Sequence, residues 1–129
     1  MKKLILGLLV ITLMGCGEET ANVSINLDES FVLGEGETGI MSDPAISVII
    51  DSVNDSRCPD DVQCIWEGEA KVKFRFQRGD DLVIDSLSTF NGVTRNIDGL
   101  MIELLEVTPY PTLNNQKKDK TIRLIIREN

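Results

Sequence analysis

The chain contains no histidine, only three cysteines and few aromatic residues. The absence of histidine excludes the Ser-His and Cys-His catalytic pairs and removes the most common metal-binding side chain. Aromatic residues form 5% of the chain, which leaves little material for aromatic shelves that bind carbohydrate or stack on nucleic-acid bases. These absences argue against the most common catalytic classes and against base-stacking proteins.

The chain also lacks an excess of positive charge and a long hydrophobic run. Its formal net charge is −8, which argues against nucleic acid as a partner and against electrostatic attraction to anionic lipid. The apolar run at residues 4–14 is about eleven residues long, whereas a membrane-spanning helix needs roughly 20. No glycine-rich phosphate loop and no dinucleotide-binding fingerprint is present.

The first residues have the pattern of an export signal. Lys2 and Lys3 form a basic region, and the apolar run follows directly. The run ends in the tetrapeptide LMGC, which resembles the lipobox of bacterial lipoproteins. The resemblance implies a cleaved signal peptide at residues 1–15, a diacylglyceryl group on the Cys16 thiol and a lipidated tether at residues 16–22.

A lipidated Cys16 would determine where the protein resides. One acyl chain anchors a protein only marginally, and stable anchoring needs a second signal, which further acylation of Cys16 would supply. Gly17 follows the cysteine, and in lipoproteins of two-membrane bacteria a residue other than aspartate favours transfer to the outer membrane. We therefore expect a protein of the bacterial cell envelope, anchored by lipid to a membrane, on either its periplasmic or its surface face.

After the tether, the dominant pattern is the two-residue alternation of β-strands. In residues 70–76 the apolar residues alternate with Lys71, Lys73 and Arg75, as in a strand with one buried face. No segment of ten residues has a helical apolar stripe. Seven or eight short strands are expected, at residues 23–27, 30–33, 45–53, 70–76, 82–90, 93–97, 100–107 and 121–128. We predict one all-β domain at residues 23–129, a small β-sandwich of the immunoglobulin-like or Greek-key type, with a small β-barrel as the alternative.

The two remaining cysteines flank a short loop between two predicted strands. In an exported protein an even pair is expected to form a disulfide, so we predict a bond between Cys58 and Cys64. A closed loop of roughly seven residues corresponds to about 2.4 kcal/mol in the chain-entropy treatment. Trp66 is expected to cover the disulfide and the open end of the core, and Gly68 to let the backbone bend close to the ring. Arg57 is expected to bind the acidic side chains around it.

The same segment matches the pattern D-S-R-C-P-x-x-V-x-C-x-W-x-G-E-A. This pattern resembles a signature in a family of small bacterial secreted proteins and lipoproteins with no assigned activity. The matching residues are Asp55, Ser56, Arg57, Cys58, Pro59, Val62, Cys64, Trp66, Gly68, Glu69 and Ala70. The resemblance implies an exported location, the Cys58–Cys64 bond and a β-rich fold.

Candidate sites other than the disulfide are weaker. The carboxylates of Asp51, Asp55, Asp60 and Asp61 could supply oxygen ligands to Ca²⁺, but their spacing does not match the known calcium loop, and a solvated acidic loop is the alternative. Glu67 and Glu69 resemble a carboxylate pair, without the substrate cleft that glycosidases need. A Ser-Lys catalytic arrangement has no motif support.

Together these features predict a lipid-anchored, non-catalytic module of the cell envelope that binds a protein or glycan or has a structural role. We expect no enzyme activity, no cofactor and no nucleic-acid partner. Two alternatives stay open: a Ca²⁺-binding module that uses the acidic cysteine loop, and an inhibitor-like module that presents this loop to a target protein.

Overall fold

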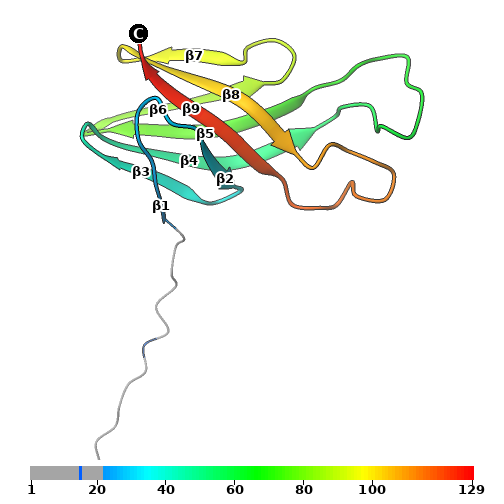
Figure 1. The fold of residues 1–129 in the computed structure, drawn as a ribbon, viewed down its shortest axis with the longest axis horizontal. Coiled ribbons are helices and arrows are strands. Elements are labelled where there is room, and N and C mark those ends of the chain that lie inside the picture. Colours follow the sequence, from blue (N-terminus) through cyan, green and yellow to red (C-terminus); the bar gives the residue numbers. More distant parts are fainter. Residues whose placement is uncertain (1–14, 16–21) are drawn as a thin grey trace, which may run out of the picture.

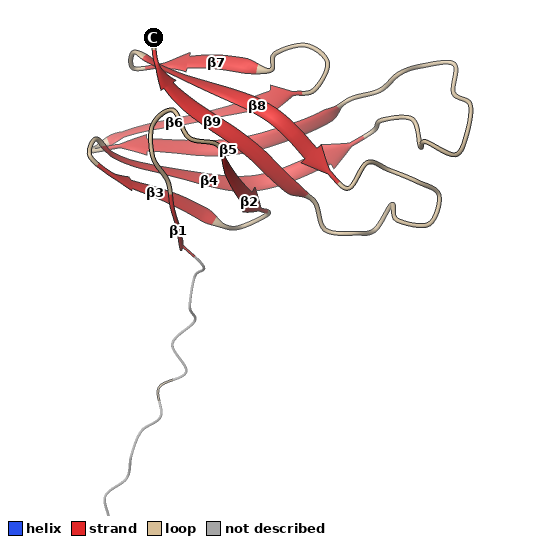
Figure 2. Ribbon diagram, viewed as in Figure 1, coloured by secondary structure: helices blue, strands red, loops and turns tan. Residues whose placement is uncertain are grey.

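The computed structural model describes Gly15 and residues 22–129, and all regular structure in these residues is β-strand (Figure 1, Figure 2). The strands are β1 (Asn22–Ser24), β2 (Phe31–Gly34), β3 (Thr38–Ser42), β4 (Ala45–Asp55), β5 (Ala70–Arg78), β6 (Asp81–Ser88), β7 (Thr94–Ile97), β8 (Leu100–Thr108) and β9 (Thr121–Glu128). Among the described residues, no helix is long and apolar enough to cross a membrane. The expected lipidation site Cys16 lies outside the described residues, as do almost all of the expected signal peptide and tether.

The strands form two packed sheets, so the predicted β-sandwich is confirmed. One sheet has the order β1-β3-β4-β5-β6 and the other the order β2-β9-β8-β7. All pairs are antiparallel except β1 with β3. The sheets do not close into a barrel, and neither sheet has the Greek-key order of neighbours, because β3 to β6 and β7 to β9 each form a meander.

The core lies between the sheets and follows the alternation in the sequence. The apolar residues of β5, from Ala70 to Phe76, are at most 1% exposed, and Ile122, Leu124 and Ile126 of β9 are fully buried. The intervening basic residues of β5 are exposed. The central strands therefore place one face in the core and the other mainly in solvent, although Ile125 on the outer face of β9 is also buried.

One strand has no clear signal in the sequence. The glycine-rich segment at residues 34–39 is predicted as a turn, yet β3 begins within it at Thr38. Gly39 is buried in β3, and a Cβ atom there would lie 3.1 Å from a methyl group of Ile25. A side chain at this position would therefore require Ile25 to shift by a few tenths of an ångström, and glycine avoids that shift.

A β-bulge in β4 changes which residues of that strand face the core. Before the bulge, Ile46, Val48 and Ile50 point inward and are at most 3% exposed. The register with β5 shifts between Ile50 and Ser52, and after the shift the inward positions are Val53 and Asp55. The extra residue thus brings a carboxylate to the inner face at the end of the strand.

Three loops meet at one end of the sandwich, which we call the loop end. They are the β4–β5 loop (residues 56–69), the β6–β7 loop (residues 89–93) and the β8–β9 loop (residues 109–120). The longest two extend beyond the sheets at the right of Figure 1. A backbone hydrogen bond of 2.9 Å from the Asp60 N–H to the Pro111 carbonyl joins the β4–β5 loop to the β8–β9 loop.

The core predicts a large cost for truncating a central side chain. Phe74 is fully buried, so Phe74→Ala is expected to lower the free energy of unfolding by about 3–5 kcal/mol through lost burial and a residual cavity. Urea unfolding monitored by circular dichroism measures this change. Leu82→Ala is the control on the same sheet, because Leu82 is 53% exposed; equal losses in the two variants would contradict this assignment of the core.

Candidate binding site at the loop end

The loop end is organised around one buried charged cluster, which we call the clamp: Asp55, Arg57 and Lys120. The Asp55 carboxylate lies 2.7 Å from Arg57 Nη2 and 3.0 Å from Lys120 Nζ. Arg57 Nε donates a second bond of 2.8 Å to the same carboxylate, so the pair is bidentate. The Asp55 and Lys120 side chains are only 7% exposed, which shields their interaction from water.

The two cations of the clamp also bind backbone carbonyls of the opposite sheet. Arg57 Nη2 donates to the Val107 carbonyl at 3.1 Å, and Lys120 Nζ donates to the Pro109 carbonyl at 2.6 Å. The clamp therefore joins the end of β4, the β4–β5 loop and both ends of the β8–β9 loop. These carbonyl dipoles also compensate the second positive charge, which the single carboxylate leaves over.

The clamp sets the protonation of Asp55. Burial alone would raise the pKa of this carboxyl, but the hydrogen bonds from Arg57 and Lys120 outweigh burial and hold the pKa below its usual value of 3.8. Asp55 is therefore a permanently ionised structural group at neutral pH.

The β4–β5 loop is a hairpin closed by the disulfide. Cys58 and Cys64 are bonded, with their Cα atoms 5.9 Å apart, which confirms the predicted pair. Below the disulfide, backbone bonds from Ser56 N–H to Glu69 O (2.8 Å) and from Cys58 N–H to Glu67 O (3.1 Å) continue the ladder of β4 and β5. The two arms of the hairpin are thus fixed to each other.

Gly68 permits a close backbone approach, but to Ser56 and not to the Trp66 ring that the sequence suggested. Its φ angle is +70°, and a Cβ atom there would lie 2.0 Å from the Ser56 carbonyl oxygen. Only glycine can bring the returning arm this close to the outgoing arm.

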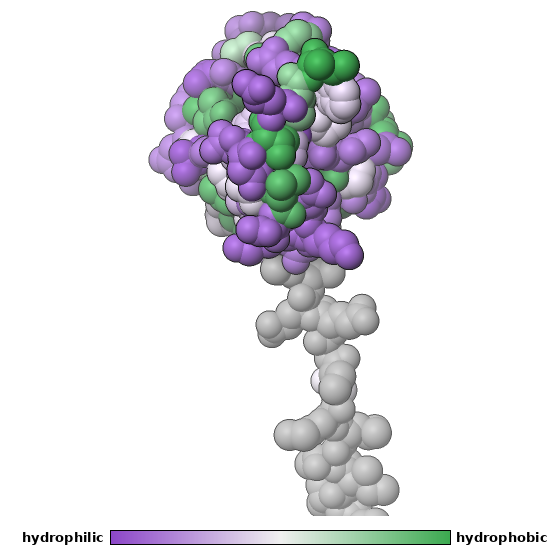
Figure 3. Space-filling view, turned by 90° about the vertical axis from the view of Figure 1, so that its right-hand side faces the viewer, coloured by the Kyte–Doolittle hydropathy of each residue, from purple (hydrophilic) through white to green (hydrophobic). Residues whose placement is uncertain are grey.

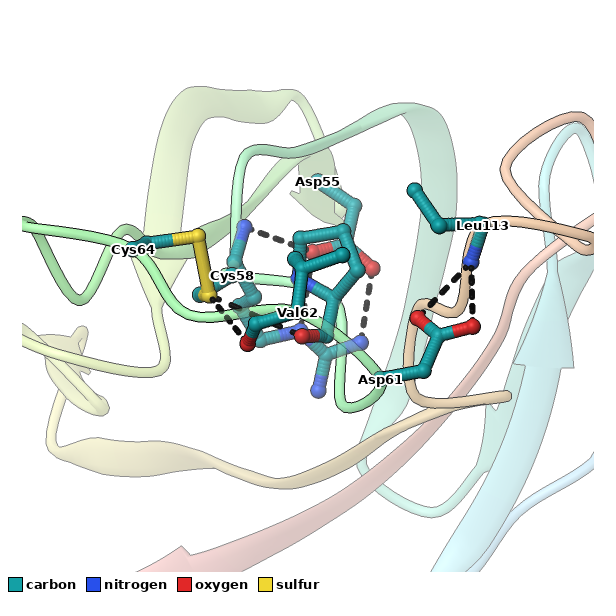
Figure 4. Close-up of a disulfide and its surroundings, with 8 residues drawn as sticks. Asp55, Cys58, Asp61, Val62, Cys64 and Leu113 are labelled. Carbon is teal, nitrogen blue, oxygen red and sulfur yellow. Dashed lines mark hydrogen bonds and ion pairs between the residues drawn. A yellow bond between two sulfur atoms is a disulfide. The ribbon is translucent and has the colours of Figure 1, made fainter.

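The β8–β9 loop supports the hairpin from one side. In Figure 4 the Asp61 carboxylate points to the backbone N–H of Leu113 and accepts a hydrogen bond of 3.1 Å from it. The Tyr110 ring lies over the Arg57 guanidinium, 4.6 Å from ring centroid to Cζ, a cation–π contact.

Pro59, which the sequence assigns to the structural signature, lies in the hairpin. Its carbonyl accepts a hydrogen bond from the Val62 N–H.

The outermost part of the hairpin is apolar and exposed. Ile65 is 97% exposed and Trp66 is 64% exposed; we call these two residues the apolar tip. Trp66 borders a pocket beside the disulfide, but it does not close the core, so that part of the prediction is wrong. At this end of the sandwich the clamp, Val107 and Pro111 are buried instead.

Other apolar side chains surround the tip. Figure 3 views the loop end directly and shows hydrophobic side chains gathered among hydrophilic ones. The exposed apolar residues of the three loops, in addition to the tip, are Val62, Phe90, Val93, Tyr110 and Leu113. Large apolar side chains that cluster on a surface mark a contact site more often than isolated ones do.

The acidic residues proposed as calcium ligands do not come together. Asp51 pairs with Arg75 at 2.8 Å on the outer face of the sheet, Asp55 belongs to the clamp, and Asp61 binds the β8–β9 loop. Asp60 is exposed, and Arg57 binds Asp55 alone among the four aspartates. In the described part of the chain, no group of three or more potential metal-binding side chains is present.

The other catalytic candidates are engaged in structural contacts. Glu69 accepts a short hydrogen bond from the hydroxyl of Ser88, and the Glu69 N–H donates to the Ser56 hydroxyl at 3.2 Å. The Glu67 carbonyl belongs to the hairpin ladder. Both glutamates also line a pocket of about 430 Å³ together with Ser56, Gly68, Phe90 and Asn91, so the structure brings the predicted pair to one concave surface.

Sequence reasoning missed Lys120. This residue is predicted in a polar loop with Lys117 and Lys118, but it is 7% exposed and completes the clamp. The only local signal is its place directly before the first residue of β9, where the chain re-enters the sandwich.

Comparison with known proteins finds no matching family model, no matching curated protein and no matching solved structure.

The clamp predicts a specific pH dependence of stability. Because the pKa of Asp55 is lowered in the folded state, its contribution is fully present above the ordinary value of 3.8 and is lost as the pH falls through the lower folded pKa. Asp55→Asn leaves two buried cations uncompensated and is expected to cost about 3–5 kcal/mol at pH 7. Urea unfolding of both proteins at pH 7 and below pH 3.8 measures the difference, which should narrow in acid. A difference that is the same at both pH values would refute the ionised clamp.

The disulfide predicts that both thiols are protected. In the native protein, neither Cys58 nor Cys64 should react with a thiol reagent until a reductant is added, as read by mass spectrometry of the peptides. The double variant Cys58→Ser/Cys64→Ser should lose about 2.4 kcal/mol of unfolding free energy, because the seven-residue loop is no longer closed in the unfolded chain. Labelling without reduction would show that the bond is absent.

Proposed function

We propose that this protein is a lipid-anchored, non-catalytic binding module of the bacterial cell envelope, which holds a protein partner at its loop end. The observation that carries the proposal is the apolar tip, with Ile65 97% and Trp66 64% exposed on a loop that is otherwise tightly bonded. Tryptophan is strongly enriched among the residues that dominate protein–protein binding energies.

The construction below the tip favours tight binding. The disulfide, the ladder of the hairpin and the clamp hold the loop in one conformation before a partner arrives. Ordering a flexible loop on binding costs free energy, and a preorganised loop avoids most of this cost. An exposed tryptophan on a rigid support is therefore suited to insert into an apolar pocket.

The charge of the hairpin indicates the chemistry of the partner. Asp60, Asp61 and Glu67 are exposed near the tip, and the one cation of the hairpin, Arg57, is used by the clamp. An acidic rim favours a partner with basic residues around its apolar pocket. The same rim disfavours insertion of the tip into anionic lipid.

The proposed anchor places the partner close to a membrane. A tether from Cys16 to Asn22 can span at most about 20 Å, at roughly 3.3–3.6 Å per residue. In the sheet, Asn22 of β1 pairs with Thr38 of β3, and Thr38 pairs in turn with Ile49 of β4. Ile49 lies six residues before the end of β4. The loop end therefore lies about 20 Å along the sheet from the point where the tether enters, leaving it free for a neighbouring envelope protein (Figure 1). If that neighbour is an enzyme, the hairpin would act as an inhibitor.

The apolar tip predicts which residues control binding. In the full-length protein, a photoreactive amino acid in place of Gln63 should crosslink to a discrete protein in intact cells. Adding Ile65→Ser and Trp66→Ser should reduce the crosslink by about 30-fold or more, since central aromatic residues contribute about 2 kcal/mol or more. The unfolding midpoint should stay unchanged because both side chains are exposed.

The matched control is Leu82→Ser, an exposed apolar residue of β6 outside the three loops. It should leave the crosslink intact. A tip variant that crosslinks as well as the parent, or the absence of a crosslink in the parent, would disprove the proposal. Trp66 is the only tryptophan, so its fluorescence reports the tip directly; a blue shift with protein-free phospholipid vesicles would instead identify lipid as the occupant.

A further inference from the structure

A second concave surface lies on the outer face of the five-stranded sheet, apart from the loop end. It is a shallow pocket of about 340 Å³ on β4, β5 and β6. The polar residues that line it are Ser52, Asn54, Lys71, Lys73, Asp85 and Ser86, and the 58%-exposed Ile84 forms an apolar wall.

The strand register places these polar groups side by side. Lys73 of β5 is directly opposite Ser52 on β4 and Ser86 on β6, so the three residues form one row across the sheet. Lys71 is opposite Asn54 and lies on the same face, two residues along the strand. Lys71 and Lys73 are adjacent on one face of β5, and the neighbouring strands are about 4.8 Å away on each side. A single small ligand can therefore reach both lysines and their neighbours.

The charges at this pocket are not balanced. Neither Lys71 nor Lys73 forms an ion pair with any residue of the described chain. The one acidic residue that lines the pocket, Asp85, is paired with Arg95 at 3.3 Å, and Asp51, the chain neighbour of Ser52, is paired with Arg75 at 2.8 Å. Two like charges therefore lie on one face of a protein whose net charge is −8.

The donors of the pocket have no other use in the structure. In the part of the chain that is described, the side chains of Ser52, Asn54 and Ser86 form no hydrogen bond to the protein. Two ammonium groups, two hydroxyls and one amide thus line the same space, together with Asp85, whose charge is offset by Arg95. Lysine binds phosphate as a point charge, and hydroxyl and amide groups add directed donors to the phosphate oxygens.

We propose that this pocket binds a phosphate group, either that of a small soluble phosphate ester or that of a phospholipid headgroup. Its volume exceeds that of a phosphate alone and leaves room for the carrier group against Ile84. The proposal is independent of partner binding at the loop end, since it uses different residues on the outer face of the sheet.

Isothermal titration calorimetry of the full-length protein in detergent, with glycerol 3-phosphate as the ligand, tests the proposal. The variant Lys71→Ala/Lys73→Ala should bind at least about 10-fold more weakly, because the unpaired charges supply most of the attraction. The matched control is Lys117→Ala/Lys118→Ala, which removes the same charge from the exposed β8–β9 loop and should change affinity less than about 2-fold. Equal losses in the two variants, or no binding to the parent protein, would overturn the site.

A second titration with glycerophosphoglycerol, a soluble phosphodiester headgroup, identifies the source of the phosphate. Tighter binding of glycerol 3-phosphate indicates a soluble monoester, and tighter binding of the diester indicates a lipid headgroup. If Lys71→Ala/Lys73→Ala binds either ligand more weakly than the parent protein does, the site is supported. If the variant binds both ligands with unchanged affinity, the site is contradicted.

Discussion

The buried ion cluster of Asp55, Arg57 and Lys120 is the interaction on which the loop end depends. It joins four chain segments that come from both sheets, and it does so with one carboxylate, two cations and two backbone carbonyls. Buried charges are costly, and a cluster of this kind contributes a defined geometry more than it contributes net stability. It closes the end of the core with polar groups, and this leaves the nearby tryptophan available for another role.

The hairpin therefore divides into two parts with different physics. Its base is fixed by the disulfide, by backbone hydrogen bonds and by Gly68, at which only glycine fits. Its tip is apolar and almost fully solvated at Ile65. Such an exposed tip contributes little to folding, whereas binding through it would remove a large apolar area from water. The contrast between the fixed base and the exposed tip supports the proposed binding role of the hairpin.

Much of the fold could be predicted because alternation in a half-buried strand is a local property. The apolar residues of β5 and β9 are buried as their spacing predicts, and the disulfide is predicted from an even pair of cysteines in a chain expected to be exported. The start of β3 could not be predicted, since Gly39 looks like a turn residue until Ile25 is packed against it. The burial of Lys120 in the clamp depends on contacts between residues fifty or more positions apart, for which the sequence alone has no pattern, and the exposure of Trp66 has no local signal either.

The bulge limits how β4 can change in length. Between Ile50 and Ser52 one additional residue reverses the alternation, so Asp55 faces inward while Ser52 and Asn54 face outward. Deleting a single residue there would leave most of the ladder intact but would rotate the carboxylate to solvent and release the hairpin from the sandwich. Insertions or deletions in this part of β4 should therefore be tolerated only two residues at a time, because a pair preserves the alternation of faces. The length of the strand at the bulge is thereby coupled to the position of the distant apolar tip.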